Sequence, residues 1–217
     1  DSTANPKIVF NQSGFYNISL VVANSVGADS AYFASAVVVG GLPLPYNSTL
    51  SQIDDYSKWQ YDEQSPGWEL EQSSKGMSFR ANLFNNPSIG AKYSLTSPSL
   101  NLTAHDSAEL SFDYAYSGQP TSAGDSLLIY AAGNCSDNWV LLAALGDDGS
   151  GNFTTTTGTN SEFNPASNDW CGNASAGCIV LDLQAFSNLE GVRLRFDAVN
   201  AGDNHIYLDN VSVVAKS

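Results

Sequence analysis

The residues best suited to chemistry are the two histidines, His105 and His205, and the 22 acidic side chains. Nucleophilic catalysis needs a nucleophile, a base and an orienting group, and neither histidine has a Gly-x-Ser-x-Gly sequence near it. The sequence contains no His-Glu-x-x-His zinc motif. Two carboxylates can hydrolyse a glycosidic bond, but so many acids single out no pair. We therefore expect no enzyme, and rank a glycoside-active enzyme third, after two non-catalytic functions.

Aromatic residues beside polar stretches indicate ligand binding instead. Trp59, Tyr61 and Trp170 lie in or beside polar segments, and a planar ring exposed there can bind a ligand, sugar rings among them. The alternative is that these rings fill a β-sheet core, which also needs large residues. We expect Trp68 and Trp139 in the core, and Trp59, Tyr61 and Trp170 at the surface as ligand-binding residues.

The charge balance limits the possible partners. The formal net charge is −14, and only 14% of the residues are charged, so nucleic acid and anionic membranes are disfavoured. The excess of carboxylates serves solubility, or some of the carboxylates hold calcium.

No run of 18 apolar residues is present, and we expect no transmembrane helix. The N-terminal sequence lacks the basic and apolar regions of a signal peptide. A secreted chain whose signal peptide has been removed would lack them too.

Two of the three cysteines lie close together. Cys171 and Cys178 are seven apart in WCGNASAGC, and we predict a disulfide between them, which would indicate an oxidising compartment. The alternative is two unpaired thiols. Cys135 is left without a predicted partner. Without a Cys-x-x-Cys pair, a zinc site is not expected.

Residues 46–217 are predicted to form one all-β domain, a β-sandwich or jelly roll, because short apolar runs alternate with Gly/Asn/Ser/Pro loops. Strict alternation in Gly191–Val214 around a polar loop predicts a β-hairpin with one buried face. Leu183–Leu189 is expected to contain a short helical turn. The predicted strands are Trp68–Gln72, Met77–Ala81, Ala91–Thr96, Ala108–Tyr116, Ser126–Ala131, Trp139–Ala144, Cys178–Leu183, Gly191–Val199 and His205–Val214.

Residues 1–40 differ from the rest, since Asp1, Lys7 and Asp29 are their only charges. The predicted strands are Lys7–Phe10, Tyr16–Ala23 and Ala31–Val39, with turns at Asn11–Gly14 and Asn24–Gly27. Residues 41–45, with alternating prolines, read as a linker.

The pattern NPKIVFNQSGFYNISLVVANSVGADS resembles the second half of a PKD domain, an immunoglobulin-like β-sandwich. The Trp-x-Phe-Gly-Asp-Gly stretch expected before it is missing. The resemblance therefore implies that residues 1–40 are the C-terminal part of such a domain and that the chain begins inside it. The alternative is that these strands add to the sheets of the next domain.

Short motifs follow one another in a specific order over residues 42–214. They are Leu44-Pro45, Trp59, Trp68, SFRAN at 78–82, LTSPSLNL at 95–102, LSFDYAY at 110–116, DSLLIY at 125–130, NCSDNW at 134–139, VRLRF at 192–196 and IYLDNV at 206–211. This order resembles the MAM-like jelly-roll modules of secreted Bacteroidetes proteins, which are similar to gingipain-type cleaved adhesin domains. The resemblance implies a jelly roll, usually stabilised by calcium, with a role in adhesion or substrate binding.

The same resemblance implies that Asp209, in the last strand, helps to hold calcium. A second ligand of the family, a Glu in a Phe-Glu pair after the Leu-Pro entry, corresponds here to Leu50-Ser51 and is therefore missing. Calcium needs six to eight oxygens. The residues that could supply the others, together with backbone carbonyls, are Asp54, Asp55, Asp113 and Asn204. For Asp113 the alternative is a solvent-facing or hydrogen-bonded carboxylate.

We expect a non-catalytic extracellular module, secreted or at the cell surface, of a larger bacterial protein. It would bind a polysaccharide, a glycoprotein or another surface protein through loops at one end of the sandwich. Modules of the resembled family often follow PKD domains behind pappalysin-type metalloproteases. The resemblance therefore also implies the alternative, a structural accessory domain of such a secreted metalloprotease, which would contact neighbouring domains of the parent chain and have no ligand of its own.

Overall fold

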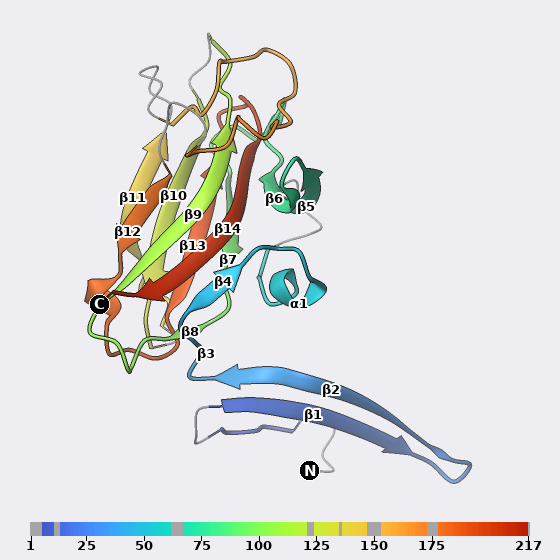
Figure 1. The fold of residues 1–217 in the computed structure, drawn as a ribbon. Helices are drawn as coiled ribbons and strands as arrows, with labels where there is room; N and C mark the ends of the chain where they lie inside the picture. Colours follow the sequence, from blue (N-terminus) through green and yellow to red (C-terminus); the bar gives the residue numbers. More distant parts are fainter. Residues whose placement is uncertain are drawn as a thin grey trace.

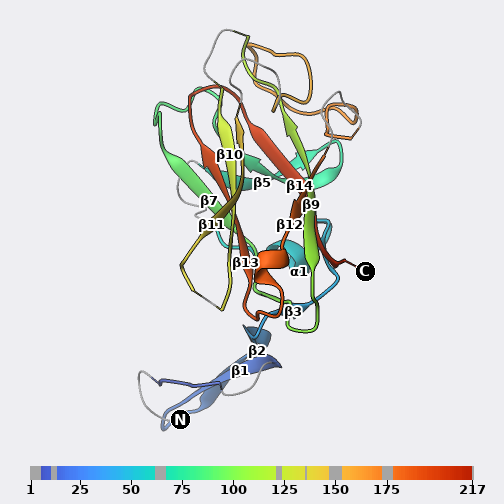
Figure 2. The same ribbon diagram turned by 90° about the vertical axis from the view of Figure 1, so that its left-hand side faces the viewer.

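A computed structural model describes residues 6–10, 14–61, 67–120, 124–134, 136–146, 153–172 and 178–216. Two β-sheets pack face to face over most of this length, and the view turned by 90° shows the two layers (Figures 1 and 2). The first sheet has the spatial order β11 (Val140–Gly146), β10 (Ser126–Ala132), β13 (Arg193–Val199) and β7 (Lys92–Thr96). The predicted all-β sandwich is therefore confirmed.

The second sheet supplies the opposite layer. Its spatial order is β12 (Ile179–Asp182), β9 (Ala108–Tyr116), β14 (Ile206–Ala215), β6 (Gly76–Ala81) and β5 (Trp68–Ser73), with β4 (Tyr46–Ser48) also paired to β14. The short strands β3 (Leu42–Pro43) and β8 (Leu100–Asn101) pair in parallel below the sandwich.

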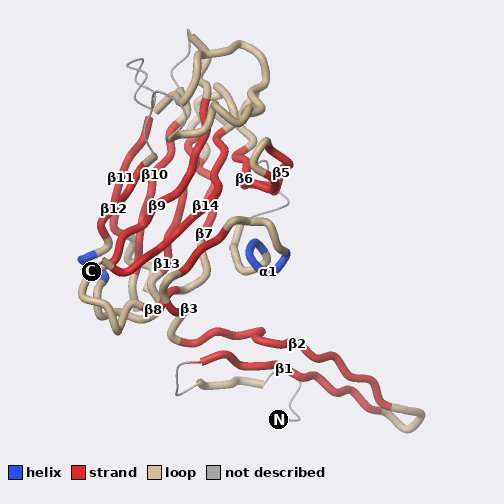
Figure 3. Tube along the Cα trace, viewed as in Figure 1, coloured by secondary structure: helices blue, strands red, loops and turns tan. Residues whose placement is uncertain are grey.

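Helical structure is confined to two short turns among the described residues, as the colouring of Figure 3 shows. They are α1 (Ile53–Tyr56) and the 3-10 turn η1 (Gln184–Phe186). η1 lies within the predicted helical turn, whereas α1, β3, β4 and β8 are too short to leave a periodic signal in the sequence. In the described part of the chain, no helix is long and apolar enough to cross a membrane.

Alternation along each strand builds the core. In β13, Leu194, Phe196 and Ala198 are fully buried between the sheets, whereas Arg193 and Arg195 point to the outer face. Leu110, Phe112 and Tyr114 of β9 face them in the same way from the opposite sheet.

The predicted hairpin in Gly191–Val214 is wrong, although both of its strands exist. β13 pairs with β10 and β7, while β14 pairs with β9, β6 and β4, so the two strands belong to opposite sheets. The buried Asp125 carboxylate holds the connecting loop, because it accepts hydrogen bonds from the backbone nitrogens of Ala201 (2.6 Å) and Asn204 (2.8 Å). Asp125 directly precedes β10 and lies 76 residues before Ala201 in the sequence. The alternation of apolar residues within the loop's own strands therefore does not reveal the contact.

The N-terminal part forms a separate hairpin of β1 (Gly14–Ala23) and β2 (Ala28–Val39), which extends away from the sandwich in Figures 1 and 2. The predicted turn is confirmed, since Asn24 Oδ1 accepts hydrogen bonds from the nitrogens of Val26 and Gly27. The predicted strand Lys7–Phe10 is wrong, because residues 6–10 have no strand pairing. Neither β1 nor β2 joins a sheet of the sandwich.

Candidate ligand-binding groove

An open groove of about 660 Å³ lies at one side of the sandwich, where the edge strand β7 of the first sheet meets the edge strand β5 of the second. It combines aromatic rings with hydroxyl, amide and ammonium groups, and none of its described lining residues is acidic. The lining residues are Gln60, Tyr61, Gly67, Trp68, Lys92, Tyr93, Ser94 and Thr96.

The floor of the groove is built from the first residues of β5 and β7. Trp68 is buried and donates a hydrogen bond from Nε1 to the carbonyl oxygen of Tyr93 (2.9 Å). The Tyr93 hydroxyl accepts a hydrogen bond from Asn86 Nδ2 (3.0 Å). A Cβ at Gly67 would lie 2.9 Å from the Tyr93 ring, so glycine is required for this close approach. The floor is therefore rigid and pre-formed.

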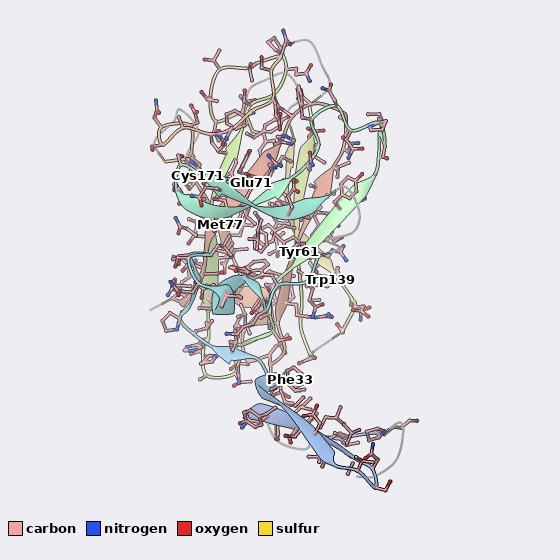
Figure 4. The ribbon with its side chains drawn as sticks, turned by 90° about the vertical axis from the view of Figure 1, so that its right-hand side faces the viewer. Phe33, Tyr61, Glu71, Met77, Trp139 and Cys171 are labelled. Atoms are coloured by element: carbon pink, nitrogen blue, oxygen red, sulfur yellow. A yellow bond between two sulfur atoms is a disulfide. The ribbon has the colours of Figure 1, made fainter. Side chains whose placement is uncertain are left out.

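Gln60 and Tyr61 form the wall beyond β7. The nitrogen of Gln60 donates to the carbonyl of Thr96 (2.9 Å), and the nitrogen of Thr96 donates back to the carbonyl of Gln60 (2.8 Å). This bridge adds Gln60 to the β7 edge of the first sheet and fixes the backbone just before Tyr61. The half-buried Tyr61 ring packs against Phe79 (centroid distance 5.4 Å) and lines the groove (Figure 4).

Polar groups at the rim offer both donors and acceptors. Gln60, Lys92 and Ser94 are exposed, and Thr96 is half-buried beside them. An aromatic ring next to a few fixed polar groups is the usual composition of a small-molecule or sugar site. Of these lining residues, only Tyr61 was predicted to bind a ligand. The alternation Lys92-x-Ser94-x-Thr96 places three polar residues on one strand face, but sequence does not show which residues lie across from it.

The expected surface positions of Trp59 and Trp170 are wrong. Trp59 is 4% exposed, packs against Phe79 and Phe196, and donates from Nε1 to Ser48 Oγ (3.3 Å). Trp170 is fully buried and donates from Nε1 to Ser74 Oγ (3.2 Å). Both rings come from polar stretches, yet long-range packing covers them, so neither offers a free face to a ligand.

Trp139 departs from expectation in the opposite direction. Trp68 is in the core as predicted, but Trp139 is half-buried on the outer face of the first sheet (Figure 4). The guanidinium carbons of Arg195 and Arg193 lie 4.5 Å and 5.1 Å from its ring centroid. Arg195 also lies 4.7 Å from the Tyr130 ring. The cation–π contacts explain why this large ring is stable outside the core.

Two of the predicted calcium ligands come together. Asp209 and Asp113 are directly opposite each other on β14 and β9. Asp209 is 1% exposed and accepts hydrogen bonds from the nitrogen of Asn210 (2.7 Å) and from Ser78 Oγ (3.2 Å). Burial raises the pKa of Asp209 to about 6. Asp113 accepts from the Lys75 ammonium, which forms an ion pair with it, and from Asn210 Nδ2 (2.7 Å).

Among the described side chains, Asn204 and Asp55 do not join this pair. The Asn204 amide oxygen accepts from the nitrogens of Phe163 (2.9 Å) and His205 (3.0 Å), and five residues of extended chain, about 16 Å, separate Asn204 from Asp209. Asp55 lies in α1 beside Thr49 Oγ1; Asp54 belongs to the same helix, and its side chain lies outside the described residues.

The pair therefore does not fit calcium as the described residues stand. Two carboxylates and one serine hydroxyl fall short of six to eight oxygens, and the Lys75 ammonium already compensates the charge of Asp113. Calcium at Asp209 stays a prediction from the resemblance.

His205 is held by structural contacts rather than placed beside a nucleophile among the described residues. His205 is buried, accepts at Nδ1 from the nitrogen of Leu83 (3.2 Å), and contacts Glu162 Oε1 through Nε2 (3.0 Å). Burial lowers the pKa of His205. The contact fastens residues 153–172 to the second sheet and places no hydroxyl or thiol nucleophile beside the ring in the described structure.

The predicted disulfide is confirmed: Cys171 and Cys178 are bonded, with their Cα atoms 4.8 Å apart (Figure 4). The bond ties the segment before β12 to β9, because the nitrogen of Cys171 donates to the carbonyl of Tyr114 (2.9 Å). The remaining cysteine, Cys135, lies outside the described residues.

Comparisons with known proteins identify the fold. No protein-family model and no curated protein matches the chain. Among solved structures, the K1 cleaved adhesin domain of Lys-gingipain from Porphyromonas gingivalis W83 is similar, with a TM-score of 0.51 and 15% identity over 79% of this chain and 98% of that one. The K2 cleaved adhesin domain of Lys-gingipain gives a TM-score of 0.52 and 12% identity over 80% and 99%. TmCBM27, a carbohydrate-binding module that recognises mannan, gives 0.47 and 12% over 79% and 96%.

The likenesses to the two cleaved adhesin domains show a shared fold. The expected resemblance to cleaved adhesin domains is confirmed at that level. The MAM-like assignment, the PKD-like origin of residues 1–40 and the domain boundaries stay predictions.

Proposed function

We propose that this chain is a non-catalytic extracellular binding module that takes a glycan, free or on a glycoprotein, in the groove between β7 and β5. The observation that carries the proposal is the composition of the groove: Tyr61 and Tyr93 stand beside Gln60, Lys92 and Ser94 on a pre-formed floor. Sugar rings present apolar faces and hydroxyl groups, and such a surface can engage both.

Two further observations support the proposal. The Cys171–Cys178 disulfide is typical of a secreted protein. Two solved structures that share the fold at a TM-score above 0.5 are cleaved adhesin domains of Lys-gingipain, and adhesion belongs to the same class of function.

The second candidate is a structural accessory domain of a secreted metalloprotease, without a ligand of its own. The β1–β2 hairpin favours this candidate, because Leu20 (58%), Val21 (64%) and Phe33 (57%) are exposed on it (Figure 4 labels Phe33). Such a surface suits contact with a neighbouring domain. The two functions differ in whether the groove binds anything.

The test is a glycan-array screen of the full chain in calcium and in EDTA, followed by calorimetry on each hit. We expect Tyr61→Ala to weaken binding about tenfold through loss of the aromatic contact. Tyr32→Ala, at an exposed tyrosine of the hairpin, is the matched control and should bind like the wild type. A screen without any hit would favour the accessory domain, and equal weakening by both variants would place the site elsewhere.

A further inference from the structure

The basic residues of this acidic chain are not evenly distributed. Of the eight lysines and arginines, three lie on the outer face of the first sheet: Lys92 on β7, and Arg193 and Arg195 on β13. The register places Lys92 opposite Val199, and Thr96 opposite Arg195. Residues opposite one another project to the same side of a sheet, so Lys92, Thr96 and Arg195 share one face.

This face is continuous with the groove. Thr96 lines the groove, bonds to Gln60 on one side and lies opposite Arg195 on the other. In the same row, Arg195 lies opposite Tyr130 of β10. A ligand seated against Tyr61 can therefore extend over Thr96 to the guanidinium group without leaving the sheet.

The guanidinium groups are held in place by their neighbours. Arg195 packs between the rings of Tyr130 and Trp139, at 4.7 Å and 4.5 Å from their centroids, and its Nε lies 3.0 Å from Asp197 Oδ1. Arg193 donates from Nη2 to the Ser136 carbonyl (2.7 Å) and pairs with the exposed Asp137 (3.0 Å). An exposed pair of this kind contributes little and leaves the cation open to a competing anion.

Lys92 is the third cation, and its environment differs. Its side chain is exposed, lines the groove, and has no acidic partner among the described residues. Among the described residues, the outer face thus carries three cations against the two carboxylates of Asp137 and Asp197, in a chain whose total charge is −14. The net charge of the chain repels polyanions, so a local cluster of cations is the part of the described surface that favours an anion.

We infer that the ligand of this site is an acidic glycan, carrying carboxylate or sulfate groups, which lies along β7 with its acidic groups at Lys92 and Arg195. The inference rests on the proposed function, since it names the class of glycan for the same groove. Lys92 lies four residues along β7 from Thr96, about 13 Å, and Thr96 is opposite Arg195. This spacing of the two cations fits a polymer with repeated acidic groups better than a single small anion.

The experiment compares polymers that differ only in charge. Polygalacturonate and its methyl ester test the carboxylate, and dextran sulfate and dextran test the sulfate, each by calorimetry with the full chain. We expect one acidic polymer to bind at least about tenfold more tightly than its neutral counterpart, as a charge-assisted hydrogen bond allows. The preference should shrink as NaCl is added.

Variants then test whether the preference for acidic polymers comes from the outer face of the first sheet. Lys92→Gln should reduce the preference for the acidic polymer over its neutral counterpart about tenfold, because the variant removes the charge and keeps a polar side chain in the groove. Lys7→Gln, at an exposed lysine of the N-terminal segment, is the matched control and should bind like the wild type. Equal loss in both variants would show unspecific attraction and overturn the inference.

The outcomes separate the two proposals. Equal binding of acidic and neutral polymers, weakened by Tyr61→Ala, would overturn the acidic ligand and leave the glycan-binding function intact. No binding to any polymer or array glycan would overturn both. An acidic preference that Lys92→Gln does not reduce would show that another surface provides it.

Discussion

Asp209 and Asp113 lie directly opposite each other on β14 and β9, yet only Asp113 is paired with a cation. The Lys75 ammonium contacts Asp113 and also lies 5.0 Å from the centroid of the buried Trp170 ring. The hydrogen-bond donors to Asp209 in the described part of the chain are Ser78 Oγ and the backbone nitrogen of Asn210. The charge of Asp113 is thus compensated by Lys75. Burial of Asp209 costs folding free energy when its carboxylate is charged and much less when it is protonated.

The burial of Asp209 predicts that the difference in stability between the wild type and Asp209→Asn depends on pH. Burial raises the folded-state pKa to about 6, above the usual value near 3.9. The stability from this group is present below pH 4 and lost as the pH rises through 6, up to about 3 kcal/mol. In EDTA, we expect denaturant titrations to show that the free energy of unfolding of Asp209→Asn rises relative to that of the wild type between pH 4 and pH 8. A difference independent of pH would contradict the burial argument, and the exposed Asp29→Asn is the control.

The same variant tests calcium. Because Lys75 already supplies a positive charge here, we expect the wild type to melt at the same temperature in calcium and in EDTA at pH 8. A rise in calcium that Asp209→Asn lacks would establish Asp209 as a ligand, as the resemblance implies. Thermal melts of both proteins in both buffers give the answer.

The strands were predictable from sequence, because alternation in segments such as Arg193–Val199 directly reflects which side chains are buried. Strand partners were not predictable. Asp125 fixes the crossing loop after β13 through hydrogen bonds to Ala201 and Asn204, and nothing local to that loop reveals it.

The candidate site was predictable only in part, for the same reason. Tyr61 was identified because it is aromatic and has polar neighbours, but Trp59, two residues earlier, fits the same description and lies in the core. Both rings contact Phe79, and what distinguishes them is the contact of Trp59 with Phe196 and the bridge from Gln60 to Thr96 just before Tyr61, all remote in sequence. The cations of the outer face likewise become one surface only through the pairing of β7 with β13.

The contact of His205 with Glu162 predicts a titration. Nδ1 accepts from the backbone nitrogen of Leu83, so Nε2 carries the proton and donates to Glu162. Burial lowers the folded-state pKa of His205, and the Glu162 hydrogen bond opposes this shift. Stability from the neutral imidazole is therefore present above the unfolded pKa of about 6.5 and lost as the pH falls below it.

NMR of the histidine ring measures this directly. We expect the His205 midpoint to lie below about 6.5 in the wild type and to fall further in Glu162→Gln, because that variant removes the interaction that favours the charged ring. The variant Glu190→Gln, which leaves the contact intact, is the control. A His205 midpoint at or above 6.5 would contradict the burial found in the structure.

The disulfide between Cys171 and Cys178 predicts a loss of stability on reduction. It closes a short loop, for which chain entropy gives about 2.5 kcal/mol, or roughly 5–10 °C of melting temperature for a domain of this size. We expect reductant to lower the melting temperature of the wild type by this amount. The double variant Cys171→Ser, Cys178→Ser should melt at the lower temperature with or without reductant. A further drop in that variant on reduction would assign the effect to another thiol.

The hairpin of residues 14–39 predicts the effect of truncation. The hydrophobic core of the sandwich, in the described residues, begins with Leu42 and Leu44 and includes no side chain before them. The carbonyl of Gly40 accepts one hydrogen bond from the nitrogen of Gly191 (3.1 Å). We therefore expect a chain of residues 41–217 to melt within about 3 °C of the full chain, since the loss of one hydrogen bond is about 1 kcal/mol.

A matched truncation makes the test specific. A chain of residues 46–217 also loses Leu42 and Leu44, which pack against the core, and should melt clearly below both longer chains. If the 41–217 chain instead melted as low as the 46–217 chain, the hairpin would stabilise the sandwich itself, and the proposed boundary at residues 41–45 would be wrong.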